Sequence, residues 1–151
     1  MRPLARSALA LTVALATTGA GYAIAARADD PPVDALGPEP VTVVIDIEHS
    51  RFTPSYVPVV EGTEVRFVVV NGDPINHELI VGPPQVHDRH RFGTEPEHPP
   101  VDGEVSVPAL ERRATSYTFD RPGLVEMACH LPGHYDYGMR GEIEVVPATS
   151  G

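Results

Sequence analysis

A short stretch near the end of the chain, CHLPGHYDYGMRG at residues 129–141, concentrates side chains that bind metal ions. It holds the only cysteine of the 151 residues, with His134 and Met139 at the spacing C-x4-H-x4-M. Pro132-Gly133 indicates a turn, so one hairpin loop can direct a thiolate, an imidazole and a thioether toward one point. A trigonal copper site with a further axial ligand needs four donors, and this loop supplies three. His77 can supply the fourth, because it follows the turn in NGDPINHELIVG and begins a predicted strand.

This donor set indicates copper. Thiolate and thioether favour copper, and two histidines and a cysteine in one plane, with a long axial methionine, are typical of a blue-copper electron-transfer site. Zinc gains little from a thioether. We therefore predict one copper ion at His77, Cys129, His134 and Met139, in preference to a buried structural cysteine with incidental histidines.

The elements that must position these ligands read as β-strands. Alternating or continuous apolar runs, separated by Gly, Pro, Asn and Asp, predict strands at 41–48, 64–71, 77–82, 104–108, 113–120, 124–130 and 141–146. Short strands in this pattern are typical of an antiparallel sandwich or barrel. No window of useful length shows the helical period, so the sequence predicts an all-β domain.

Three stretches carry a family resemblance. RFTPSYVPVVEGTEVRFVVVN, HELIVG and CHLPGHYDYGMRG resemble the cupredoxins, small copper-binding proteins, and in particular a bacterial exported cupredoxin-like subgroup. The resemblance covers about residues 41–147. It implies a Greek-key β-sandwich with type 1 copper, which cycles between Cu(I) and Cu(II), at the four residues named above.

The resemblance also raises two expectations about the surroundings of the copper. Many cupredoxins place Asn or Asp after the first histidine ligand to hold the two ligand loops together. Here Glu78 stands there, and Asn71 or Asn76 are the candidates to replace it. Electrons are expected to leave at the edge of His134, through a patch whose candidate members are Leu131, Pro132, Ile75 and Pro74.

The beginning of the chain reads as a targeting segment. Residues 1–28 combine a short basic start, an apolar stretch and the site Ala26-Arg27-Ala28, which indicates a cleaved signal peptide; an uncleaved membrane anchor is the alternative. Residues 29–40 are acidic and proline-rich and read as a linker. We expect a cupredoxin domain at 41–147, a tail at 148–151, and a secreted or periplasmic location on the outer face of the cytoplasmic membrane.

Charge excludes one class of partner. After residue 28, eight arginines stand against 21 acidic residues, a formal net charge of −13. Nucleic-acid binding needs clustered cations, so it is excluded. We expect a redox partner protein with a basic docking face, such as an oxidase, reductase or cytochrome. Contact with a membrane is expected only through an uncleaved anchor.

A long polar segment at residues 83–103 reads as a loop and contains His87, His90 and His98. These three imidazoles could form a second, weaker copper site, or they could simply be solvated. His130 adjoins Cys129 and should point to the opposite face of its strand, away from the copper. We interpret His130 as an ordinary half-exposed residue and His49 as a surface residue.

The sequence thus indicates an exported copper protein that transfers single electrons. The alternative is a copper carrier, chaperone or buffer for copper delivery or tolerance, which would use the same ligands. An enzyme is not expected, because the chain has no second complete metal site, no Ser–His–Asp pattern and no phosphate-binding loop.

Overall fold

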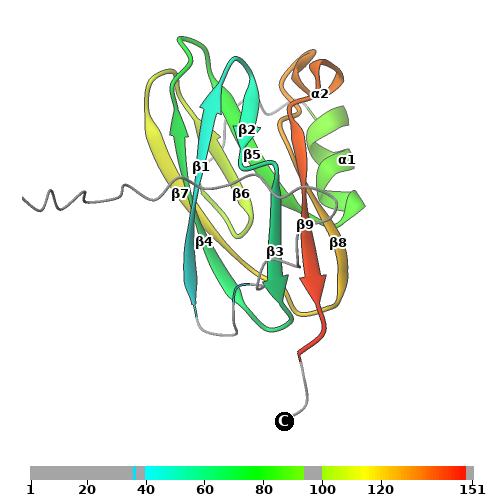
Figure 1. Cartoon of the computed structure of the whole chain (residues 1–151). Helices are drawn as coiled ribbons and strands as arrows, with labels where there is room; N and C mark the ends of the chain where they lie inside the picture. Colours follow the sequence, from blue (N-terminus) through cyan, green and yellow to red (C-terminus); the bar gives the residue numbers. More distant parts are fainter. Residues whose placement is uncertain (1–35, 37–39, 94–99, 149–151) are drawn as a thin grey trace, which may run out of the picture. The chain divides into compact units, whose positions relative to one another are not determined.

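The computed structural model describes residues 36, 40–93 and 100–148, and these build a sandwich of two β-sheets (Figure 1). The segment at 1–28, nearly all of the linker, and His98 lie outside the described residues. One sheet has the order β2 (Arg51–Thr53), β1 (Val41–Glu48), β4 (Glu64–Asn71), β7 (Arg112–Thr118). The other has the order β3 (Tyr56–Val60), β9 (Arg140–Val146), β8 (Gly123–Ala128), β5 (His77–Gly82), β6 (Glu104–Val107). The predicted all-β sandwich is confirmed.

The seven predicted strands all form, and two further strands, β2 and β3, were not predicted. Both are edge strands, one in each sheet. Edge strands tolerate proline, which explains why Pro58 can sit inside β3 and why the run YVPVV does not read as a strand. The sandwich is also not purely antiparallel, since β1 pairs with β4, and β3 with β9, in parallel.

The prediction of a loop throughout residues 83–103 is wrong for its first half. Residues Pro84–Phe92 form the helix α1, which contacts β5. Proline is favoured in the first helical turn, since its missing N–H has no partner there. The segment PQVHDRHRF lacks an apolar stripe, which is why no helical period is visible in the sequence. Only His87 among its residues is buried.

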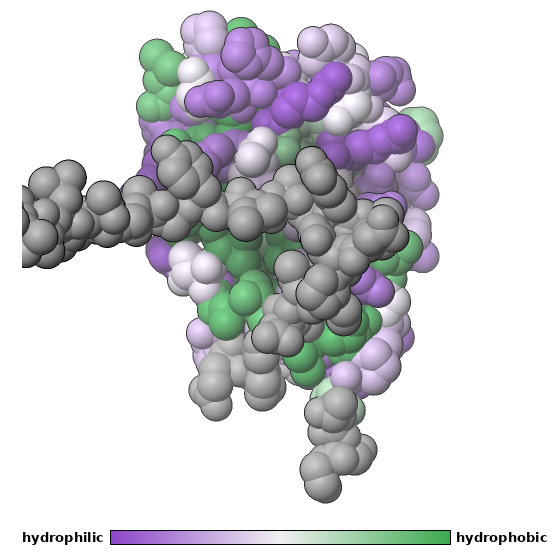
Figure 2. Space-filling view, in the orientation of Figure 1, coloured by the Kyte–Doolittle hydropathy of each residue, from purple (hydrophilic) through white to green (hydrophobic). Residues whose placement is uncertain are grey.

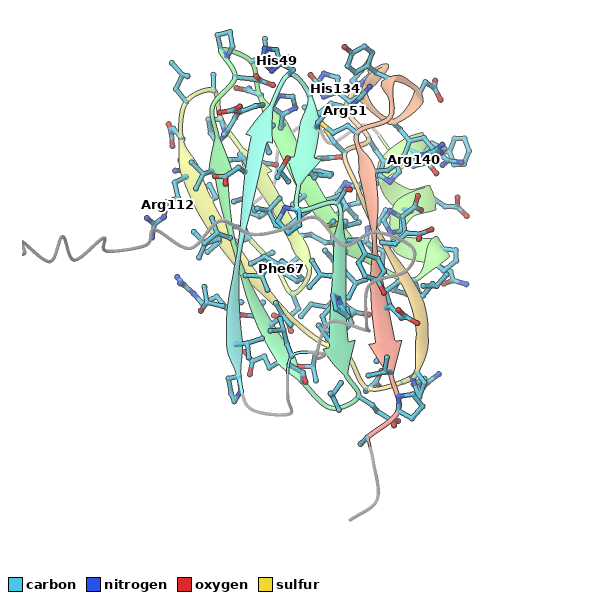
Figure 3. All side chains as sticks on the ribbon, viewed as in Figure 1. His49, Arg51, Phe67, Arg112, His134 and Arg140 are labelled. Atoms are coloured by element: carbon cyan, nitrogen blue, oxygen red, sulfur yellow. The ribbon has the colours of Figure 1, made fainter. Side chains whose placement is uncertain are left out.

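The core lies between the sheets. Phe67 and Phe119 are fully buried and meet edge to face, with ring centroids 6.3 Å apart, and Met127 is completely buried beside them in the same cluster. The prediction that these three side chains belong to the core is confirmed. Figure 3 shows Phe67 in the middle of the sandwich, with His49, Arg51 and His134 together at one end.

Candidate metal centre

The four predicted ligands come from neighbouring strand ends. His77 is the first residue of β5, and Cys129 directly follows β8. β5 and β8 are adjacent and antiparallel, so the start of one and the end of the other lie at the same end of the sheet. His134 opens a short helix, α2 (His134–Tyr137), and Met139 stands between α2 and β9. The sandwich therefore gathers all four residues at one end.

The donor atoms of three of the four predicted ligands lie close together. The ligand atoms of His77, Cys129 and His134 all lie within 4.8 Å of one another. The two Nδ1 atoms of the histidines are 3.2 Å apart, and Cys129 Sγ is 3.3 Å from His134 Nδ1. A thiol and two imidazoles in this arrangement fit a copper ion. Met139 is fully buried in the same core cluster as Cys129.

The ligand loop owes its shape to two glycines and to the backbone. Gly133 and Gly138 flank α2 with φ angles of 83° and 99°, in the left-handed region that favours glycine. The N–H of Cys129 donates to the carbonyl of Met139 at 3.1 Å, and the N–H of Met139 donates to the carbonyl of His134 at 3.0 Å. The three predicted ligands of this loop are thus tied to one another by the main chain.

Asp73 orients His77, a role that the sequence analysis missed. Its carboxylate lies 3.0 Å from His77 Nε2 and also accepts the N–H groups of His49 and Ser50, both at 2.8 Å. A carboxylate only accepts, so Nε2 carries the proton and Nδ1 presents its lone pair to the metal. The only signal in the sequence is an aspartate four residues before the ligand.

The pKa values fit this role for Asp73. Burial opposes ionisation of Asp73, but the N–H groups of Ser50 and His49 and the His77 ring outweigh it and lower the pKa. Burial and the neighbouring His134 together lower the pKa of His77 more than Asp73 raises it. At neutral pH His77 is therefore an uncharged imidazole, the form that binds metals.

Glu78, not an asparagine, holds the two ligand loops together. Its Oε1 accepts the backbone N–H of His130 at 2.7 Å, directly after Cys129. Asn71 and Asn76 instead bind the segment before β7: Asn71 Nδ2 donates to the carbonyl of Val107, and Asn76 Oδ1 accepts the N–H of Ala109. The expectation that Asn71 or Asn76 takes the role of the asparagine or aspartate found in many cupredoxins is therefore wrong, since Glu78 itself joins the loops.

The thiol of Cys129 is protonated in the metal-free chain. Burial raises its pKa to about 12, although the backbone N–H groups of Glu78 and Leu131 act in the opposite direction. A thiolate is the form that ligates a metal, so a metal ion must displace this proton.

His87 and His90, two of the histidines predicted for a second copper site, bind different partners. His87 and His90 both lie on α1, but His87 Nδ1 faces His130 Nε2, whereas His90 Nε2 faces Glu104 Oε2 at 2.7 Å. His130 is half-buried, as expected, and its ring meets that of His87 from α1 edge to face. Burial, His87 and Arg91 together lower the pKa of His130 to about 4. His49 is exposed, as predicted.

A site of two imidazoles and one buried thiol at the end of a two-sheet sandwich defines a cupredoxin. The chain belongs to the plastocyanin/azurin family of copper-binding proteins, whose family model matches residues 40–146. The predicted family and the predicted cofactor, copper, are confirmed.

Two curated relatives are similar over much of the chain. The copper-resistant cuproprotein CopI of Rubrivivax gelatinosus is 31% identical over 159 residues, which cover 96% of each chain. The protein of the same name from Pseudomonas aeruginosa is 25% identical over 129 residues, which cover 64% of this chain and 71% of the relative.

Solved structures agree on the fold. Auracyanin A of Chloroflexus aurantiacus superimposes with a TM-score of 0.58 at 23% identity, covering 71% of this chain and 99% of auracyanin. The dithionite-reduced auracyanin of Roseiflexus castenholzii gives a TM-score of 0.59 at 20% identity, with coverages of 70% and 97%. Among the described residues of this chain, no helix is long and apolar enough to cross a membrane.

Proposed function

We propose that this protein is an exported type 1 copper protein that transfers single electrons and catalyses no reaction of its own. His77, Cys129 and His134 would be the strong ligands and Met139 the weak axial one. Copper bound there supplies one-electron chemistry, because it can exchange between Cu(I) and Cu(II). The observation that carries the proposal is the convergence of the three donor atoms within 4.8 Å.

The surrounding residues support electron transfer because they hold the donors in place before any metal binds. Asp73 fixes the ring of His77, Glu78 joins the two ligand loops, and Arg51 donates to the carbonyl of Tyr137 in α2. The guanidinium of Arg51 also lies 4.3 Å from the centre of the Tyr137 ring. A site held this way reorganises little when the charge on the metal changes.

Exposure supports His134 as the exit for electrons. His77, Cys129 and Met139 are 1% exposed or less, whereas His134 is half-buried. Pro132 is exposed and Ile75 is 46% exposed. Leu110, whose N–H donates to the carbonyl of Asp73, is 70% exposed. Figure 2 shows hydrophobic residues at the corner where β4 ends and β7 begins, whereas the rest of this end of the molecule is largely hydrophilic. A partner could dock on this rim, and the acidic chain favours one with a basic face.

An absorption and EPR spectrum of the copper-loaded protein tests the proposal. We expect an intense visible charge-transfer band that disappears reversibly on reduction. Cys129→Ser should abolish the band, because the thiolate is its source. A band that survives this substitution would overturn the ligand assignment.

A second candidate function, holding copper for tolerance, is favoured by the likeness to CopI over nearly the whole chain. It would use the same ligands, in an exported protein. Copper exchange separates the two functions. An electron carrier keeps its metal through repeated oxidation and reduction, whereas a copper carrier gives Cu(I) to a competing chelator at a rate that suits delivery.

A further inference from the structure

A second pair of histidines lies on the other side of Cys129. His87 comes from α1 and His130 directly follows Cys129, and the two are 43 residues apart in the sequence. Their rings meet edge to face with centroids 5.1 Å apart, and His87 Nδ1 is 2.9 Å from His130 Nε2.

The hydrogen bonds of His87 point its lone pair at His130. His87 Nε2 lies 3.2 Å from the carbonyl oxygen of Gly82 and 3.3 Å from that of Glu126. Carbonyl oxygens only accept, so Nε2 carries the proton and Nδ1 is an unprotonated donor atom. Asp73 orients His77 in the same way at the first site, and metal-binding histidines usually have such a partner on the remote nitrogen.

The backbone N–H of His130 donates to Glu78, but one nitrogen of its ring lacks a partner among the described residues. Its Nδ1 is buried and has no hydrogen-bond partner there. Its ring is stacked on Tyr135, with centroids 5.3 Å apart. A buried polar atom without a hydrogen-bond partner needs an explanation.

The spacing of the two nitrogens fits a shared metal ion. Two nitrogens about 2.0–2.1 Å from a metal lie about 2.9 Å apart when the angle between them is a right angle, and about 3.3 Å apart at a tetrahedral angle. The pair His87–His130 at 2.9 Å and the pair His77–His134 at 3.2 Å both fall in this range.

Glu126 offers a third donor. Its Oε2 is 3.9 Å from His87 Nδ1, while its Oε1 accepts the hydroxyl of Tyr135 at 2.8 Å, which holds the carboxylate in place. A surface groove of about 500 Å³ is lined by both His87 and Glu126. His90, on the same helix, is bound to Glu104 instead.

From this arrangement we infer that His87, His130 and Glu126 form a second copper site, selective for Cu(II). Two imidazoles and a carboxylate contain no soft sulfur ligand, so the site lacks the donors that Cu(I) prefers, and Cu(II) is the divalent first-row ion that such ligands bind most tightly. The guanidiniums of Arg91 and Arg140 lie 4.7 and 5.0 Å from the centre of the Tyr135 ring, and their charges should weaken the site.

The test is a Cu(II) titration of the full chain followed by calorimetry and EPR. The first equivalent saturates the visible band of the first site. We expect a second equivalent to bind without adding to that band, and to give a separate EPR signal with nitrogen ligands.

Five variants, His98→Ala among them, then assign the second equivalent. His87→Gln keeps a donor for the Gly82 carbonyl, and His130→Phe keeps a ring against Tyr135; each should weaken the second equivalent by about 100-fold or more, since even outer-shell changes cost 10–100-fold. His90→Gln is the matched control and should leave it unchanged. Arg91→Gln should tighten it. The visible band reports that each variant is folded.

The inference is overturned if the parent binds one equivalent only, or if the second equivalent persists in both His87→Gln and His130→Phe. It is also overturned if His90→Gln or His98→Ala removes the second equivalent while His130→Phe does not. That result would assign the ion to the set His87, His90 and His98, which the sequence of the segment indicates.

Discussion

Glu78 Oε1 accepts the backbone N–H of His130 at 2.7 Å, and this contact joins the strand that begins with His77 to the loop that begins with Cys129. Glu78 is 2% exposed, so the bond is shielded from water. Glu78, which follows the predicted ligand His77, thus fixes His130, which follows the predicted ligand Cys129.

Removing this contact should destabilise the fold around the copper site. We expect Glu78→Ala to lower the free energy of unfolding by about 1–3 kcal/mol, because a buried N–H loses its acceptor. Urea unfolding of the copper-free protein measures this. Glu78→Gln keeps an oxygen acceptor and serves as the control; equal losses in both variants would show that the charge, and not the bond, matters.

Met139 should tune the copper site rather than hold the metal. An axial thioether is a long, weak ligand, so the copper should remain bound when it is lost. Met139→Leu should raise the reduction potential, because a donor to Cu(II) is gone, and Met139→Gln should lower it, because an oxygen donor favours Cu(II). Voltammetry compares the two. Potentials that do not move in either variant would remove Met139 from the ligand set.

Copper binding should release one proton from Cys129. Burial raises the pKa of this thiol to about 12, so it is protonated throughout the range from pH 7 to 9. The affinity for copper should therefore rise about tenfold for each pH unit in that range. Competition titrations measure the slope. Cys129→Ser lacks the thiol and should show a flatter dependence; an equal slope in this variant would point to another group.

Electrons should pass near His134. Leu131→Asp or Pro132→Asp places a charge on the rim and should slow electron self-exchange between copies of the protein while leaving the absorption spectrum almost unchanged. Leu124→Asp, at an exposed apolar residue in β8, adds the same charge elsewhere. Similar slowing at both places would contradict a single exit.

The ion pairs of Glu104 should make stability depend on pH. Burial opposes ionisation of Glu104, but Arg89 and His90 outweigh it and lower its pKa below the ordinary 4.5. The folded chain then binds fewer protons than the unfolded chain, so this contribution is complete above about pH 4.5 and disappears as the pH falls through the lower, folded value.

Glu104→Gln should consequently destabilise the protein at pH 7 and much less at pH 3, which urea midpoints at the two pH values can measure. Glu111→Gln is the control, because Glu111 pairs with Arg113 at the surface, where ion pairs contribute little. A loss at Glu104 that is the same at both pH values would indicate packing rather than charge.

The sequence by itself determined the features that depend on residues close together in the chain, namely the ligand loop and the buried strands. Cys129, His134 and Met139 lie within eleven residues, so their spacing and chemistry indicate a copper loop without a structure. The central strands are recognisable because they are buried, and burial requires a run of apolar residues. The edge strand β2 is only three residues long, β3 is interrupted by Pro58, and the helix α1 buries only His87, so none of them shows a clear pattern in the sequence.

Only the tertiary structure decided the contacts between distant polar side chains. Asp73 reaches His77 across a turn, Glu78 reaches the N–H of a residue 52 positions away, and His87 meets His130 from a helix that the sequence does not predict. Such contacts need two groups placed within a few tenths of an ångström by separate backbone segments. No periodic pattern encodes that placement, because each side chain alone looks like an ordinary surface residue; the packing of α1 and the two sheets brings the partners together.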